Sequence, residues 1–368
     1  MILKKLSILN YKNIQQSEAL FSPQMNCFFG NNGMGKTNLL DAIYYLSFCK
    51  SYMNTPDNQV IYNAEEMCVI QGSYDYDGRE ENIFCAIRRR QRKQFTRNKK
   101  EYERLSEHIG LLPIVMISPA DVGLIQGGSE ERRRFLDLII SQQDKPYLRA
   151  LIQYNKALTQ RNILLKNQSP DTALYEALEM QLDRYGRFIY EKRVELINSF
   201  IPVFNEYYQS ICCSSEQVNL RYLSQLENGG DLAEMLARNR ERDRLSGYTS
   251  AGIHKDELEM NLNELLIRRT GSQGQNKTYL TALKLAQFAF LKQKGQTTPI
   301  LLLDDIFDKL DAGRVEQIIQ LVSNPAFGQI FITDTNRKYL DEILAAMNHD
   351  YALFRVEQGS IQYMENNI

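Results

Sequence analysis

The fold of this chain is decided by the stretch Gly30-Asn31-Asn32-Gly33-Met34-Gly35-Lys36-Thr37, which matches the pattern G-x-x-x-x-G-K-[ST]. Glycines let the backbone N–H groups wrap around phosphates, and the N-terminus of a following helix adds partial positive charge. Residues 25–29 read as a strand before the loop, and residues 38–48 read as an apolar-periodic helix after it. Because strand, loop and helix agree, we prefer a nucleoside triphosphate site to a plain connecting turn, with Lys36 on the phosphates and Thr37 on Mg²⁺.

A second chemical signal lies near the other end of the sequence. The apolar run 300–303 is typical of a buried parallel strand, and it ends in Asp304 and Asp305. In a phosphate-loop enzyme the first acid would hold magnesium and the second would polarise the attacking water. Neighbouring residues of an ideal strand point to opposite faces, so the two acids can divide these roles only where the backbone turns at the strand end. We predict Asp304 as a metal residue, and Asp305 and Lys36 as the catalytic residues.

Length and composition indicate an ordinary protein of two lobes. The 368 residues include 44 Lys plus Arg and 45 Asp plus Glu, a formal net charge of −1. This balance gives no bulk electrostatic case for nucleic acid, so a DNA-binding surface would have to come from local clustering. No stretch approaches a membrane span, and the start of the chain lacks the apolar core of a signal peptide. The six cysteines show no C-x-x-C spacing, which predicts reduced core residues and a cytoplasmic protein without a membrane partner.

The order of strand and helix patterns predicts an α/β ATPase lobe that is interrupted by a helical lobe. Strand signals dominate up to about residue 119, with Asp77-Gly78 as a hairpin turn. Helical periodicity then prevails, and two apolar stripes separated by the breakers of 167–171 predict an antiparallel helical hairpin with arms of roughly 22–29 residues. The α/β pattern returns after about Glu257. We expect the ATPase lobe to comprise 1–119 and 251–368, and the helical lobe 120–250.

One segment carries a dense run of cations. Between residues 88 and 100 every residue is Arg or Lys except five, and these cations could neutralise several DNA phosphates. We take five of them as candidate DNA-binding residues: Arg88, Arg89, Arg90, Arg92 and Lys93. A solvated hairpin face would show the same pattern, and that alternative stays open.

A third motif precedes another helical pattern. Gly271-Ser272-Gln273-Gly274-Gln275 resembles the S-G-G-Q signature of ABC-type ATPases, with Gln273 in place of one glycine. Residues 306–311, which follow Asp305, resemble the D-loop of that family. The resemblance implies that Ser272, Gly274 and Gln275 contact the nucleotide held by the opposite monomer, so that ATP drives formation of a homodimer. In isolation the segment is better explained as an ordinary loop before a helix, and that alternative stays open.

Further blocks make the resemblance more specific. The chain resembles the RecF family of SMC-like ABC ATPases through Asn10-Tyr11-Lys12-Asn13-Ile14, Ser118-Pro119-Ala120-Asp121, Gly127-Gly128-Ser129 with 132–137, and Gly252-Ile253-His254-Lys255-Asp256-Glu257. These blocks cover nearly the whole chain in order. Many ABC ATPases place a switch histidine after the strand that here ends at Thr333, and this chain has Asp334 instead.

The resemblance implies a function as well as a fold. It implies a weak ATPase using ATP and Mg²⁺, with Lys12 among the nucleotide-binding residues. It also implies binding to double-stranded DNA near single-strand gaps and gap junctions, and help in loading RecA together with RecO and RecR. Two alternatives are a transporter-type ABC subunit and an SMC-like ATPase of another system. The RecF-type blocks and the short helical insertion argue against both.

Overall fold

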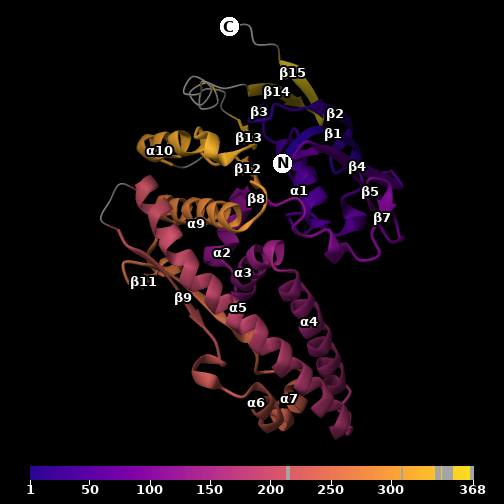
Figure 1. Cartoon of the computed structure of the whole chain (residues 1–368), viewed down its shortest axis with the longest axis vertical. Helices are drawn as coiled ribbons and strands as arrows, with labels where there is room; N and C mark the ends of the chain where they lie inside the picture. The colour runs from indigo at the N-terminus through magenta and orange to yellow at the C-terminus, as the bar shows by residue number, and fades with distance from the viewer. Residues whose placement is uncertain (213–215, 308–309, 336–340, 342–350, 365–368) are drawn as a thin grey trace. The chain divides into compact units, whose positions relative to one another are not determined.

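The computed structural model describes residues 1–212, 216–307, 310–335, 341 and 351–364. The chain divides into two compact units (Figure 1). Unit 1 contains Met1–Asp121, Ser210–Cys212 and Lys277–Ile368, and unit 2 contains Val122–Gln209 and Cys213–Asn276. The second boundary therefore lies later than the predicted residue 250, because a small sheet that follows the long helices packs with them in unit 2.

The core of unit 1 is a six-stranded mixed sheet with the order β15-β14-β3-β13-β12-β8. Every neighbouring pair is parallel except β14 with β15. Its strands are β3 (Met25–Phe29), β8 (Ile114–Ile117), β12 (Ile300–Asp304), β13 (Ile330–Asp334), β14 (Tyr351–Glu357) and β15 (Ser360–Met364). All residues of β8, β12 and β13 are buried, although β8 stands last in the strand order and only β12 and β13 are inner strands.

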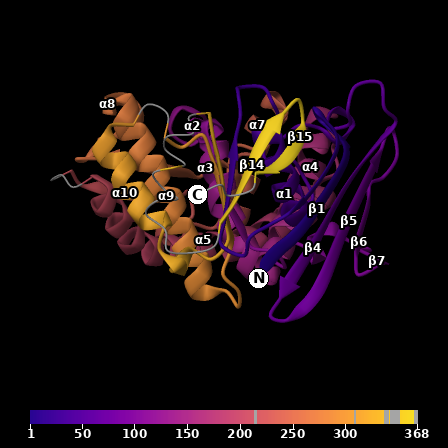
Figure 2. The same ribbon diagram turned by 90° about the horizontal axis from the view of Figure 1, so that it is seen from above.

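The second sheet of unit 1 is antiparallel, and Figure 2 shows its strands side by side. Its order is β2-β1-β4-β5-β6-β7. The strands are β1 (Ile2–Tyr11), β2 (Ile14–Leu20), β4 (Met67–Tyr76), β5 (Arg79–Arg88), β6 (Gln94–Arg97) and β7 (Lys100–Glu101). Asp77 and Gly78 join β4 to β5 with φ angles of 53° and 80°, so the predicted hairpin turn is confirmed.

Helix α1 (Lys36–Phe48) contacts strands of both sheets. All but two of its residues are buried, which explains why its sequence is apolar on nearly every side. Unit 1 also contains most of α9 (Gln273–Lys294), all of α10 (Ala312–Val322) and the last residues of the long helix α5 (Thr172–Cys212). Short 3-10 turns are η1 (Asp57–Gln59), η2 (Leu105–Glu107), η3 (Pro119–Asp121) and η6 (Pro325–Phe327).

Unit 2 is mainly helical and includes a three-stranded antiparallel sheet with the order β11-β10-β9. Its helices are α2 (Val122–Gln126), α3 (Ser129–Gln143), α4 (Lys145–Lys166), α5 (Thr172–Cys212, with its last residues in unit 1), α6 (Leu232–Arg238), α7 (Arg240–Ser246) and α8 (Ile267–Thr270). Its strands are β9 (Val218–Leu223), β10 (Glu257–Leu262) and β11 (Leu265–Leu266), and its 3-10 turns are η4 (Glu227–Gly229) and η5 (Ile253–Lys255).

The predicted antiparallel hairpin is formed by α4 and α5 (Figure 1). Asp144 caps α4 by accepting a hydrogen bond from the Tyr147 N–H, with a proline in the first turn. Helix α5 has 41 residues, more than either predicted arm, and it continues through Pro202. A proline inside a helix costs about 3 kcal/mol. Burial of Phe200, Phe204 and Tyr208 on either side of it offsets that cost.

Two fully buried arginines connect the helices of unit 2. Arg161 lies 2.7 Å from Asp243 of α7 and 3.0 Å from Glu179 of α5. Arg193 of α5 lies 2.8 Å from Asp137 of α3. Each guanidinium also donates to a backbone carbonyl, so these ionic groups are well hydrogen-bonded. Among the described residues, no helix is both long enough and apolar enough to span a bilayer.

Candidate nucleotide-binding site

The phosphate-binding loop joins β3 to α1, as the sequence predicts. Gly33 and Gly35 have φ angles of 79° and 111°, a region that favours glycine. The Lys36 side chain is buried, and its Nζ donates to the Gly30 and Asn31 carbonyl oxygens at 2.8 and 3.2 Å. The lysine ammonium thus lies against the loop whose N–H groups would hold phosphates. Asn32 and Met34 complete the loop.

The hairpin of β14 and β15 supports this loop from a distant part of the sequence. The Gly359 N–H donates to the Met34 carbonyl oxygen at 2.8 Å. A methyl group added at Gly30 would overlap the Val356 carbonyl oxygen, and one added at Gly359 would overlap that of Asn13. The backbones therefore approach too closely for any side chain at these two glycines. The sequence predicted neither this hairpin nor its contact with the loop.

Asn13, between β1 and β2, is a second support that sequence reasoning did not assign to the site. Its amide donates to the Gly33 carbonyl oxygen at 3.2 Å, and its own carbonyl oxygen accepts from the Asn38 amide at 2.8 Å. These bonds connect the loop to the first turn of α1. The available signal was the Asn10–Ile14 block, which marked the segment without giving Asn13 a role.

Asp304 ends β12 with its carboxylate buried beside the loop. One oxygen accepts from Thr37 Oγ1 at 3.0 Å and from Thr333 Oγ1 at 2.8 Å, and the other accepts from Ser118 Oγ at 3.3 Å. Burial raises the pKa of the Asp304 carboxyl, while the bonds from Thr333 and Thr37 lower it. A carboxylate next to a hydroxyl is the oxygen donor set that Mg²⁺ prefers, so Thr37 and Asp304 fit the predicted metal.

Asp305 follows with a φ of 45°, so the backbone turns here into the left-handed region. Its N–H donates to the Thr333 carbonyl oxygen at 3.2 Å. Such a turn allows two adjacent acids to serve one site, because neighbouring residues of a straight strand point to opposite faces. Asp334 ends the neighbouring strand β13 opposite Phe29 of β3, which places it beside the start of the loop. Asp308 and Lys309, in the predicted D-loop, lie outside the described residues.

Lys12 occupies the corner between β1 and β2 with a φ of 52°. Its Nζ lies 2.6 Å from Oδ2 of Asp41, a fully buried carboxylate on α1. Tyr11 donates its hydroxyl to the same oxygen at 2.6 Å, and burial together with Asp41 raises the pKa of that phenol. Asp41 comes one helical turn after Thr37. The predicted nucleotide contact of Lys12 is thus anchored to the helix that begins at the loop.

The signature segment opens α9 and belongs to unit 2. The Ser272 N–H donates to Gln275 Oε1 at 2.8 Å, and the Gln275 N–H donates to Ser272 Oγ at 3.2 Å. This reciprocal pair is a capping box. Gln275 Nε2 also donates to Glu216 at 2.7 Å, whereas Gly274 has no side chain to commit. The phosphate-binding loop belongs to unit 1, so a single unit does not contain both motifs.

The basic cluster lies at and after the end of β5, and its cations differ in exposure. Arg88, Arg90 and Arg92 are exposed. Arg89 is half-buried, with its Nε bonded to the Glu65 carbonyl oxygen at 2.8 Å. Lys93 points inward, 2.9 Å from Asp57, with its side chain 14% exposed. Its charge is directed away from solvent, so we omit Lys93 from the DNA surface proposed below.

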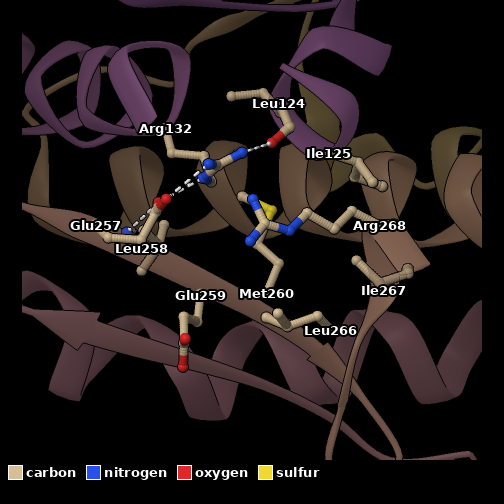
Figure 3. A pocket seen from close by; sticks show the side chains of 10 residues that line it. All are labelled: Leu124, Ile125, Arg132, Glu257, Leu258, Glu259, Met260, Leu266, Ile267 and Arg268. Carbon is tan, nitrogen blue, oxygen red and sulfur yellow. Dashed lines mark hydrogen bonds and ion pairs between the residues drawn. The ribbon is translucent and has the colours of Figure 1, made fainter. Parts of the chain in front are cut away.

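Arg132, a cation in the family-like block 132–137, is also inward-facing and 4% exposed. Figure 3 shows its guanidinium joined to Glu257 and to the Leu124 carbonyl oxygen. The two ion-pair bonds measure 2.6 and 2.8 Å. The group borders a cavity of about 30 Å³, also lined by Met260 and Arg268. That volume holds about one water molecule, so the cavity is a packing gap and not a ligand site.

The comparisons with known proteins agree with this geometry. The chain matches the family described as "RecF/RecN/SMC N terminal domain" over residues 2–362. A "DNA replication and repair protein RecF" from Parabacteroides distasonis is 76% identical over 365 residues, covering 99% of this chain and 100% of the relative. Its namesake from Bacteroides fragilis strain YCH46 is 58% identical over 367 residues, covering 99% of both.

Solved structures show the same fold. A structure of "the recombination mediator protein RecF-ATP in RecFOR pathway" superposes with a TM-score of 0.89 at 26% identity, covering 99% of this chain and 97% of that one. An Smc head domain from Pyrococcus furiosus gives a TM-score of 0.59 at 18% identity, covering 99% and 96%. The predicted P-loop ABC-type α/β fold is confirmed. This chain belongs to the RecF family.

Proposed function

We propose that this chain is an ATP-dependent DNA-binding protein of recombinational gap repair. Its family membership supports a role in DNA replication and repair. The observation that carries the ATP part is the contact between Thr37 and Asp304, which joins the phosphate-binding loop to the acidic end of β12. Those residues are 267 positions apart in the sequence, and a plain connecting turn would give no reason for their meeting.

In this proposal the chain binds ATP with Mg²⁺ at the loop. Lys36 leaves the loop carbonyls to contact the β- and γ-phosphates, Lys12 binds the nucleotide from the β1–β2 corner, and Thr37 and Asp304 hold the metal. The metal supplies charge neutralisation to the phosphate oxygens. Asp305 orients the attacking water, and hydrolysis is slow because an aspartate reaches less far than a glutamate in that position.

ATP also drives dimerisation in this proposal. Ser272, Gly274 and Gln275 of one protomer complete the nucleotide site of the other, and Asp334 takes the place of the switch histidine. The ATP-bound dimer binds duplex DNA next to single-strand gaps and helps RecO and RecR to load RecA. Exposed Arg88, Arg90 and Arg92, with Arg89 beside them, contribute contacts to DNA phosphates.

The test is sedimentation of the protein with ATP, with ADP and without nucleotide, alone and with gapped duplex DNA. We expect the protein to be a dimer with ATP and a monomer with ADP or without nucleotide. The dimer should bind the gapped DNA. Lys36→Ala should weaken ATP binding by about 1.5–3 kcal/mol, since it removes a charge-assisted contact. Ser272→Arg should bind ATP yet remain monomeric. A monomer with ATP, or a Ser272→Arg protein that dimerises like the parent, would refute the shared site.

A further inference from the structure

Asp121 forms a buried polar cluster behind the Asp304 carboxylate. Its side chain and that of Lys284 are 6% and 7% exposed, and Lys284 Nζ lies 2.8 Å from Asp121 Oδ1. Tyr52 donates its hydroxyl to the same oxygen. The other oxygen, Oδ2, accepts from the Ser118 N–H at 2.8 Å. The cluster thus joins three segments that are distant in sequence.

Ser118 connects this cluster to the ATP site. Its backbone N–H is held by Asp121, while its hydroxyl donates to Asp304 Oδ2 at 3.3 Å. The other oxygen of Asp304 faces Thr37 and Thr333. Ser118 therefore hydrogen-bonds the carboxylate oxygen of Asp304 that is not bonded to the two threonines. Asp121 in turn fixes the position of Ser118. The path from Lys284 to Asp304 has two intermediates, Asp121 and Ser118.

Stability gives no sufficient reason for this arrangement. A buried ion pair pays a desolvation penalty that its Coulomb attraction roughly offsets, and apolar replacements of similar volume are often neutral or stabilising. Lys284 also lies in a stretch of α9, from Thr278 to Gln287, in which every residue is buried. The Asp121–Lys284 ion pair fixes the position of the Ser118 backbone and hydroxyl, which an apolar contact would not do.

We propose that Asp121 and Lys284 are positioning residues of the ATP site, acting through Ser118 to hold the Asp304 carboxylate in the orientation that binds the metal of Mg-ATP. The inference rests on the proposed function and deepens it. Because α9 begins directly after Ser272, the same path ties the metal carboxylate to the helix that carries the signature segment. A shift of Lys284 along the helix axis would therefore move Asp121 and Ser118 and change the orientation of the Asp304 carboxylate.

The test measures binding of a slowly hydrolysed ATP analogue by calorimetry, without magnesium and over a range of Mg²⁺ concentrations. Removing a hydrogen-bond partner of a metal ligand typically costs 10–100-fold in metal affinity. Ser118→Ala should therefore raise the Mg²⁺ concentration for half-maximal binding about tenfold or more, with magnesium-free affinity unchanged within about twofold. Ser118→Thr, which keeps the hydroxyl, should restore the parental requirement.

Ser47→Ala is the matched control. Ser47 is a buried serine of unit 1 that donates to the Leu112 carbonyl oxygen, outside this path. It should leave the Mg²⁺ requirement unchanged. Lys284→Met should raise the requirement in the same direction as Ser118→Ala. Because Lys284 acts through Ser118, the double variant should be no worse than Ser118→Ala alone.

Four outcomes would count against the inference or against the function on which it rests. Additive effects of Ser118→Ala and Lys284→Met would show independent routes and overturn the path. Equal losses with and without magnesium, together with a lower unfolding temperature, would assign the cluster to structure alone and also overturn it. A Ser118→Ala protein with the parental Mg²⁺ requirement would refute the inference while leaving the proposed function intact. A parent that binds no nucleotide would refute the proposed function itself.

Discussion

The guanidinium of Arg161 and the carboxylate of Asp243 are both fully buried and lie 2.7 Å apart, joining α4 to α7. Removing one partner of a buried pair leaves an uncompensated charge and typically costs about 3–5 kcal/mol. We expect Asp243→Asn to destabilise unit 2 toward the lower end of this range, since Glu179 still pairs with Arg161. Hydrogen exchange of α7 amides would measure the loss.

Asp183→Asn provides the comparison for that variant. Asp183 pairs with Arg187 at i,i+4, and the two side chains are 23% and 41% exposed. Exposed pairs of this kind contribute about 0.3–0.5 kcal/mol. If both variants change exchange equally, burial of the Arg161 pair has no energetic consequence, and the larger cost expected for Asp243→Asn is wrong.

Gly359→Ala should weaken ATP binding. Gly359 has a φ of 79°, and a methyl group there would overlap the Asn13 backbone next to the phosphate-binding loop. Gly78→Ala is a matched control, because Gly78 has a φ of 80° but no atom within 4 Å of the added carbon. Both variants carry the left-handed cost of about 1–2 kcal/mol. Nucleotide affinity should fall in Gly359→Ala and stay parental in Gly78→Ala.

The stability of the protein should fall as pH decreases below about 6.5, in part because of His254. Its Nδ1 meets the Tyr154 hydroxyl at 2.8 Å and its Nε2 meets the Thr249 carbonyl oxygen at 3.0 Å. Burial lowers the pKa of His254 from 6.5 to about 4. The unfolded chain therefore takes up a proton near pH 6.5, whereas the folded chain does so only near 4, and folding loses stability across that window.

The size of this effect follows from the shift. Each pKa unit between the unfolded and the folded chain corresponds to about 1.4 kcal/mol. The lower pKa of His254 in the folded chain therefore removes about 3 kcal/mol of stability between pH 6.5 and 4. Urea unfolding of the parent and of His254→Gln at pH 7 and pH 5 would test it. The variant should lose less stability than the parent on acidification, and equal losses would show that other groups account for the decline.

Asp305→Asn should retain ATP and accumulate as the ATP-bound dimer, because it keeps the left-handed turn that asparagine tolerates but loses the acid that orients water. The measurements are the rate of phosphate release and the mass in ATP. Hydrolysis at the parental rate would remove Asp305 from the role assigned to it.

Replacing Arg88, Arg90 and Arg92 by alanine should flatten the salt dependence of duplex DNA binding. Each neutralised phosphate contributes about −0.9 to the slope of log affinity against log salt. These three side chains are exposed, so the fold and ATP-driven dimerisation should be unaffected. An unchanged slope would assign the cluster to a solvated face.

Local sequence patterns predicted the parts of the site that neighbouring residues form. The loop, the strand 300–303 and the acids after it were evident because each is contiguous and has a strong spacing signal. Orientation was not evident from sequence. The inward direction of Lys93 and of Arg132 depends on Asp57 and Glu257, which lie far away along the chain.

The residues that support the Asp304 carboxylate were not predicted, because their partners are also distant in sequence. Ser118 meets Asp304 across 186 positions, and the chain from Asp121 to Lys284 spans a similar separation. No periodicity or motif reports such a pairing. The predicted arms of roughly 22–29 residues are shorter than α5, which continues through Pro202 because the aromatic residues on either side of it are buried.

The strand that delivers the phosphate-binding loop, β3, lies between β13 and β14 in the sheet. Both partners come from the last part of the sequence, at Ile330–Asp334 and Tyr351–Glu357. During translation β3 leaves the ribosome roughly three hundred residues before either neighbour, at about 5–20 residues per second. A nascent chain consequently has no finished nucleotide pocket for most of its synthesis. The ATP-driven dimerisation that we propose would therefore begin only after β13 and β14 have been made.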